Sequence, residues 1–143
     1  MVIADVYEDG SIHELERTSR PVNLGHDAFV QDKLSERSIN AAIRVLRDYC
    51  KLMDTYDVSM TRAVATSAAR DASNGDAFLE RIQMTVGLDV EVIDPMEQSR
   101  LIVAALRNEA EEELNLSGRV VAIAEVGGGS TLLTVLRRGN IAA

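Results

Sequence analysis

A glycine-rich segment near the end of the chain contains the residue types of a phosphate-binding loop. A strongly apolar run leads to the acid Glu125, and the residues after Val126 offer backbone N–H groups and hydroxyls: Gly127, Gly128, Gly129, Ser130 and Thr131. Glycines let the main chain approach an oxyanion because no Cβ stands in the way. A carboxylate such as Glu125 beside the loop can hold Mg²⁺ next to the phosphates. Taken alone, the segment is equally compatible with a flexible hairpin turn.

A second polar segment follows a short apolar run at residues 60–66. Thr66 and Ser67 supply hydroxyl donors, and Arg70 supplies a guanidinium that can bind two phosphate oxygens at once. In α/β sheets, ligands bind beyond the carboxyl ends of the strands, which is where this segment should lie. The plain alternative is that Thr66 and Ser67 cap a turn while Arg70 pairs with a surface acid.

A third segment, Glu97–Arg100, begins a predicted helix after another strand. A carboxylate at this place can orient a water molecule as a general base. The structural alternative is an ordinary polar first turn, since Glu97 is favourable near the positive end of the helix dipole and Arg100 can pair with it. Taken alone, the second and third segments favour a structural role, whereas the glycine segment is evenly balanced. Because all three follow predicted strands, however, together they predict one shared crevice.

Hydrophobic periodicity predicts the elements that hold these segments. Apolar residues spaced by three and four predict helices at 35–56, at 74–86 and from 95 onward. Alternating or β-branched runs predict strands at 2–7, 11–20, 60–66, 89–93, 119–126 and 131–137, with 21–33 as a loop. Strands that alternate with helices indicate an α/β fold with right-handed crossovers and a mixed sheet.

Composition limits the partners. The 143 residues include 23 acidic and 15 basic side chains, a net charge of −8, and no run rich in lysine or arginine. This charge argues against binding to nucleic acid or to an anionic membrane surface. No apolar run approaches the roughly 20 residues of a membrane span. The single cysteine, Cys50, cannot form an intramolecular disulfide, so we expect a soluble protein of the reducing cytoplasm.

In their order and spacing these segments resemble the N-terminal part of the exopolyphosphatase and guanosine-pentaphosphate phosphohydrolase (Ppx/GppA) family. The matching pieces span essentially the whole chain: Leu15–Arg17 with Val22–Gly25, Leu34–Glu36, Ala63–Asn74, Phe78–Ile82, Glu97–Ile102 and Val126–Thr131. The resemblance implies an actin-like, ribonuclease-H-like fold, a mixed sheet flanked by helices, in which two domains enclose the active site. It also implies Mg²⁺-assisted hydrolysis of a terminal phosphoanhydride in polyphosphate or guanosine pentaphosphate.

The resemblance also assigns residues. Arg70 would contact phosphate, Gly127–Thr131 would form the phosphate loop, and Glu125 would position Mg²⁺. Residues 1–125 would be the first actin-like domain, without its usual first strand and Gly-Ser-Asn-Ser-like phosphate loop. Residues 126–143 would be the opening hairpin of an incomplete second domain.

Two positions depart from the family pattern. Gln98 stands where the family has its catalytic glutamate, and a glutamine cannot accept a proton as a base. The neighbouring Glu97 points about 100° away on a helix. Glu125 stands where the family usually has aspartate. We therefore expect weak hydrolysis.

Other functions remain open on the sequence alone. One is a non-catalytic module of the same fold that binds a phosphorylated guanine nucleotide and regulates another process. Another is an actin-like kinase or ATPase, which leaves the Arg70 segment and Glu97–Ile102 unexplained. A homodimer is compatible with each of these readings.

Overall fold

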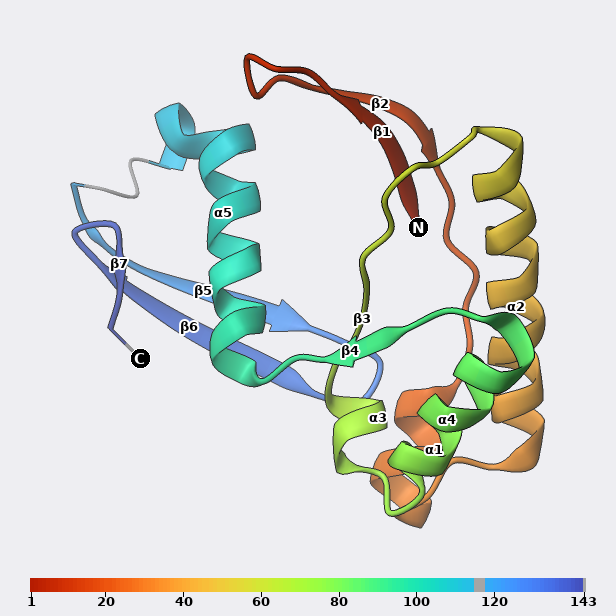
Figure 1. Ribbon diagram of the computed structural model, residues 1–143. Coiled ribbons are helices and arrows are strands. Elements are labelled where there is room, and N and C mark those ends of the chain that lie inside the picture. Colours follow the sequence, from red (N-terminus) through yellow and green to blue (C-terminus); the bar gives the residue numbers. More distant parts are fainter. Residues whose placement is uncertain (115–117, 143) are drawn as a thin grey trace.

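The chain folds into three small sheets and five helices, counted over the residues that the structure describes (Figure 1). The computed structural model describes residues 1–114 and 118–142, without the side chains of 108–114. The strands are β1 (Val2–Val6), β2 (Ile12–Arg17), β3 (Ala63–Ala65), β4 (Val90–Val92), β5 (Val120–Val126), β6 (Thr131–Arg137) and β7 (Asn140–Ile141). The helices are α1 (Leu24–Gln31), α2 (Glu36–Thr55), α3 (Ser67–Asp71), α4 (Gly75–Val86) and α5 (Pro95–Leu114).

The strands confirm the α/β class but correct the expected single sheet. β1 and β2 form an antiparallel hairpin, β3 and β4 form a parallel pair, and β5, β6 and β7 form an antiparallel sheet. In the described part of the chain, no ladder joins these three sheets. Parallel and antiparallel pairing are both present, but in separate sheets.

The parallel pairing of β3 with β4 places the predicted segments as expected. Strands that run parallel end at the same edge, so Thr66 and Glu97 follow neighbouring strand ends. β5 and β6 pair along their whole length, from Val120 with Arg137 to Val126 with Thr131. The proposed division between residues 125 and 126 therefore falls at the end of one strand of a hairpin. The division into domains stays a prediction.

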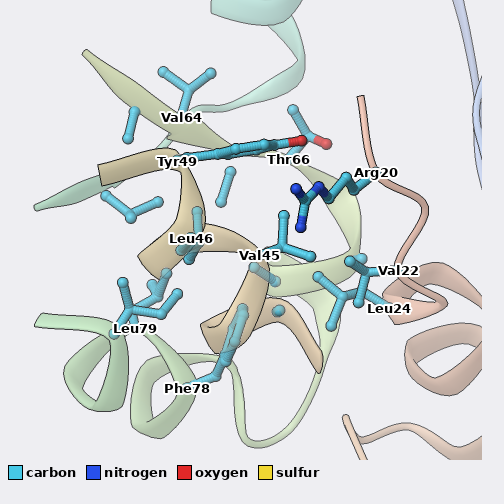
Figure 2. A pocket seen from close by; sticks show the side chains of 17 residues that line it. Arg20, Val22, Leu24, Val45, Leu46, Tyr49, Val64, Thr66, Phe78 and Leu79 are labelled. Carbon is cyan, nitrogen blue, oxygen red and sulfur yellow. The ribbon is translucent and has the colours of Figure 1, made fainter. Parts of the chain in front are cut away.

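The long helix α2 forms for reasons visible in the sequence. Ser35 is its N-cap, and the Ser35 side chain accepts a hydrogen bond from the backbone N–H of Ser38. Its apolar face packs into the main core cluster, whose buried members are Ala28, Leu34, Ile39, Ala42, Ile43, Ala69, Ala72, Phe78 and Ile82. An apolar cavity of about 340 Å³ lies between α2, α4 and β3 (Figure 2). Among the described residues, no helix has the length and apolarity to cross a bilayer.

Helix α1 corrects the expectation of a loop at 21–33. Its N-cap residue, Asn23, makes no side-chain hydrogen bond, and its C-cap, Asp32, is left-handed with φ 58°. Asn23 is a residue type that often caps helices but makes no cap here, and the C-terminal end has an aspartate where glycine is usual. The buried Asp27 attaches α1 to the start of α2, because its carboxylate accepts a hydrogen bond from the backbone N–H of Ser35 at 3.0 Å.

Asp27 should make the fold sensitive to acid. Hydrogen bonds from Ser35 and Ser38 lower the pKa of Asp27 from 3.8 to about 2. Because the pKa is lower in the folded chain, Asp27 stabilises the fold fully above pH 3.8, and this contribution is lost as the pH falls toward 2. We expect Asp27→Asn to be less stable than the wild type at neutral pH, with the difference shrinking across that window.

Urea denaturation at several pH values checks this expectation. Asp89→Asn is the matched control, because it removes the same charge at an exposed position in the connection between α4 and β4. Parallel pH profiles for the wild type and Asp27→Asn would show that Asp27 does not provide the acid sensitivity.

A candidate phosphate site

One polar pocket brings most of the predicted site residues together. It has a volume of about 190 Å³ and lies where α1, α3, the start of α5 and the turn between β5 and β6 meet. The predicted residues that line it are Thr66, Ser67, Gln98, Glu125, Gly127, Gly128, Gly129 and Ser130. Figure 1 shows the β5–β6 turn beside α3. The crevice expected from three separate strand ends is therefore a single pocket.

Two hydrogen bonds join distant parts of the chain across this pocket. The side-chain amide of Gln98 donates to a carboxylate oxygen of Glu125 at 2.6 Å. The hydroxyls of Ser67 and Ser130 lie 2.8 Å apart. Each bond connects the β5–β6 hairpin to an element that follows β3 or β4. The glycine turn is thus attached to both of the other predicted segments.

A buried hydroxyl pair fixes the start of α5 against the hairpin. The hydroxyls of Ser99 on α5 and Thr134 on β6 lie 2.7 Å apart, and both residues are buried. The carboxylate of Asp94 accepts from the backbone N–H of Glu97 at 2.8 Å and so caps the helix. Because Gln98 precedes Ser99, this anchoring places the Gln98 amide next to Glu125.

Of the three glycines, Gly129 is the one that has no room for a side chain, and none of them needs glycine for its backbone dihedrals. None of Gly127, Gly128 and Gly129 has a positive φ. The Gly127 N–H donates to the carbonyl of Ser130 at 2.8 Å and closes the turn. A Cβ on Gly128 would meet no atom within 4 Å, so open space lies beside its main chain. Within the described residues, the N–H groups of Gly128 and Gly129 have no protein partner, which leaves them available to a ligand.

Arg70 lies outside the pocket lining. Its guanidinium donates to the backbone carbonyl of Ile93 at 2.9 Å and to the Asp71 carboxylate at 3.2 Å. The first bond ties the end of α3 to the residue after β4. In this arrangement Arg70 supports the two segments that carry Thr66 and Glu97, and its contact with phosphate stays a prediction.

Glu97 also lies outside the pocket lining. Its carboxylate accepts from Arg100 at 2.6 Å and from Arg62 at 3.3 Å. Arg100 first, and Arg62 second, lower the pKa of Glu97 to about 2. A general base works best when its pKa is near the working pH, so a carboxylate held at this pKa is a weak base. Its catalytic role stays a prediction.

Sequence reasoning missed one wall of the pocket. Thr131 is absent from the lining, whereas residues that were not predicted complete it: Val22, Gly25, Phe29, Ala68 and Leu132. Gly25 and Phe29 belong to α1, which reads as a loop in the sequence. Their spacing of four residues is the single signal that could have placed them on one helical face.

Among the described residues that line this pocket, Glu125 is the one that carries a charge. Across the part of the chain that is described, no group of three or more His, Cys, Asp or Glu side chains could hold a metal ion. Mg²⁺ commonly binds through one or two carboxylates together with substrate phosphates. The residues present fit this kind of magnesium site, because Glu125 can supply one ligand and the other ligands would come from substrate and water.

Backbone amides, hydroxyls and one carboxylate around a pocket at strand ends are the elements of an α/β site for phosphate chemistry. Comparison with known proteins identifies the family. The chain belongs to the Ppx/GppA phosphatase family, whose family model matches residues 2–142. The resemblance found in the sequence is thereby confirmed.

Individual relatives agree with this assignment. The chain is 31% identical to exopolyphosphatase 2 of Mycobacterium tuberculosis over 139 residues, which are 92% of this chain and 42% of that protein. An Aquifex aeolicus Ppx/GppA family member matches with a TM-score of 0.78 and 33% identity, over 99% of this chain and 44% of that one. An exopolyphosphatase from Cytophaga hutchinsonii matches with a TM-score of 0.88 and 26% identity, over the same shares. The chain thus spans less than half the length of these relatives.

Proposed function

We propose that the chain is a phosphatase domain of the exopolyphosphatase type that binds the terminal phosphates of polyphosphate and hydrolyses the phosphoanhydride weakly. The observation that supports this most is the convergence of Glu125, the glycine turn and the Thr66–Ser67 hydroxyls in one pocket. We choose polyphosphate as the first substrate in this proposal because two of the relatives are named exopolyphosphatases. Guanosine pentaphosphate is the second substrate in this proposal.

The pocket offers neutral donors to an anion. The N–H groups of Gly128 and Gly129 and the hydroxyls of Thr66, Ser67 and Ser130 can donate to phosphate oxygens. The lining residues that the structure describes include no cation, and their one charge is the carboxylate of Glu125. A bare phosphate would be repelled by this carboxylate, so binding requires a compensating cation. Mg²⁺ held by Glu125 and the phosphates would supply that charge and polarise the phosphoryl group.

Gln98 explains why hydrolysis should be weak. Its amide donates to Glu125 and so orients the carboxylate. An amide cannot take a proton from an attacking water, and removal of a general base commonly costs a factor of about 10² to 10⁴ in rate. Gln98 therefore serves binding by positioning Glu125, and the water is left without a base at this position.

The proposal also includes the actin-like fold and the division into two domains. The mixed α/β fold and the likeness to solved Ppx/GppA structures support an actin-like, ribonuclease-H-like arrangement. In it, residues 1–125 are the first domain and 126–143 open the second. The lone Cys50 suits a reducing cytoplasm, and the net charge of −8 suits a protein that does not bind nucleic acid or anionic membranes.

Phosphate release from long-chain polyphosphate tests the proposal. We expect slow release that requires Mg²⁺ and is lost in Glu125→Gln, because the substitution removes the carboxylate that faces the phosphates. Glu80→Gln is the matched control, since Glu80 is exposed on α4 and outside the pocket. Equal release by both variants would exclude Glu125 as the metal ligand, and fast release by the wild type would refute the impairment.

A second candidate function is a binding module without turnover. The Gln98–Glu125 hydrogen bond favours it, because the family position of the base is used to hold a carboxylate. Calorimetry with polyphosphate and with guanosine pentaphosphate separates the two functions. Saturable binding without phosphate release supports the module, whereas the absence of binding to either compound excludes both functions.

A further inference from the structure

Helix α1 lies directly against the glycine turn. A Cβ on Gly129 would lie 2.3 and 2.7 Å from two ring carbons of Phe29 and 3.0 Å from the carbonyl oxygen of Gly25. A Cβ on Gly25 would lie 3.1 Å from the carbonyl group of Gly128. Both approaches are closer than two methyl-sized groups allow. The contact between α1 and the turn therefore leaves no spare room on either side.

The Phe29 side chain makes this contact from outside the main core. Its neighbour Ala28 is buried in the core cluster, whereas Phe29 is 43% exposed and does not belong to that cluster. Gly25 and Phe29 are four residues apart, so they lie on the same face of α1. That face lines the pocket. The Phe29 ring therefore packs against the glycine turn rather than into the main core.

The glycine turn has few hydrogen bonds of its own. Gly127 and Ser130 are tied by one backbone bond, and Ser130 is tied to Ser67. Gly128 and Gly129, which present the free N–H groups, have no such bond in the described part of the chain. Packing against Phe29 and Gly25 is the restraint on this part of the turn.

We propose that Phe29 is a positioning residue for the anion-binding turn. Its ring packs against Gly129, next to the contact between Gly25 and the Gly128 carbonyl, and so restrains the turn in the conformation that lines the pocket. This restraint reduces the entropy cost of binding phosphate. This role rests on the proposed function, because it requires the turn to be where phosphate binds. Gly129 is a glycine because the ring occupies the place of a Cβ.

Calorimetry with tripolyphosphate and Mg²⁺ tests the role in binding. We expect Phe29→Ala to weaken binding about tenfold while the melting temperature changes little, because the ring is outside the core. Phe29→Leu should recover part of the affinity. Val30→Ala is the matched control, since Val30 is 68% exposed on the same helix and outside the pocket. Wild-type affinity in a folded Phe29→Ala variant would overturn the proposal.

Two measurements without ligand test the role of Phe29 independently of the proposed phosphate function. Amide hydrogen exchange at Gly128 and Gly129 should be faster in Phe29→Ala than in the wild type and unchanged in Val30→Ala. Gly129→Ala should lower the melting temperature, and adding Phe29→Ala should restore part of it, because removing the ring makes room for the new Cβ. Unchanged exchange together with additive melting temperatures would refute the role of Phe29. A wild type that binds no tripolyphosphate but passes both measurements would refute the phosphate function alone.

Discussion

Replacing Gln98 by glutamate is expected to raise Mg²⁺-dependent phosphate release from polyphosphate by a factor of about 10² to 10⁴, the usual contribution of a general base. The amide nitrogen of Gln98 lies 2.6 Å from the Glu125 carboxylate, so the new carboxylate would lie at the edge of the same pocket. Its side chain has the same shape, and the change is therefore purely chemical: a group that cannot accept a proton is replaced by one that can. Steady-state release of inorganic phosphate measures the effect.

The same substitution has a second consequence that helps to interpret the rate. Two carboxylates this close repel each other, which raises the pKa of one of them and destabilises the pocket without a cation. We expect the melting temperature of Gln98→Glu to rise with Mg²⁺ more than that of the wild type. Gln83→Glu on α4 adds the same charge at an exposed site far from the lining and should change neither quantity. If Gln98→Glu binds polyphosphate with Mg²⁺ but releases phosphate no faster, then position 98 is not where the base acts.

The parts of the fold that the sequence predicts are those with local signals. The helix over Glu36–Thr55 has a serine cap and apolar residues at helical spacing, and both act within a few residues of the chain. Gly87 ends α4 in the left-handed conformation with φ 75°, as a glycine at this place indicates. In these elements local propensity and tertiary packing favour the same structure.

Elements that depend on distant contacts could not be predicted in the same way. Helix α1 lacks a side-chain N-cap, and its position depends on Asp27 bonding to Ser35 and on contacts with the glycine turn. Helix α3 has five residues, which is too short to show a periodic pattern. The single mixed sheet was wrong because the pairing of strand edges is decided in three dimensions.

The same contrast between local signals and distant contacts holds for the candidate site. That Thr66 and Gln98 lie together follows from the rule that parallel strands end at the same edge. The glycine turn belongs to another sheet, and it reaches the same pocket through the Gln98–Glu125 and Ser67–Ser130 hydrogen bonds. The direction of Arg70 does not follow from that rule. Its hydrogen-bond acceptor, the Ile93 carbonyl, is 23 residues away in sequence and comes close because β3 pairs with β4. As a residue type, Arg70 indicated a phosphate ligand. In the folded chain its guanidinium donates to a backbone carbonyl instead.

The largest expected effect on stability comes from Gly75→Ala. A Cβ at Gly75 would lie 1.9 Å from the carbonyl oxygen of Ala69, an overlap that no side-chain rotation can relieve because the obstacle is backbone. Gly75 is buried at the first position of α4, directly after the segment that contains α3. We expect a loss of about 3 kcal/mol or more in the free energy of unfolding, the upper range for overpacking in a well-packed core. Urea denaturation measures it.

Gly128→Ala is the matched control, because a Cβ there would meet nothing within 4 Å and its φ is not positive. It should change the free energy of unfolding by no more than about 0.5 kcal/mol. Equal stabilities of the two variants would mean that α3 and α4 can separate at no cost. In that case α3 would not hold Ser67 firmly against Ser130. A large effect at Gly75 would show instead that α3 and α4 cannot move apart to admit a Cβ, and α3 carries Ser67 and Ala68 of the pocket lining.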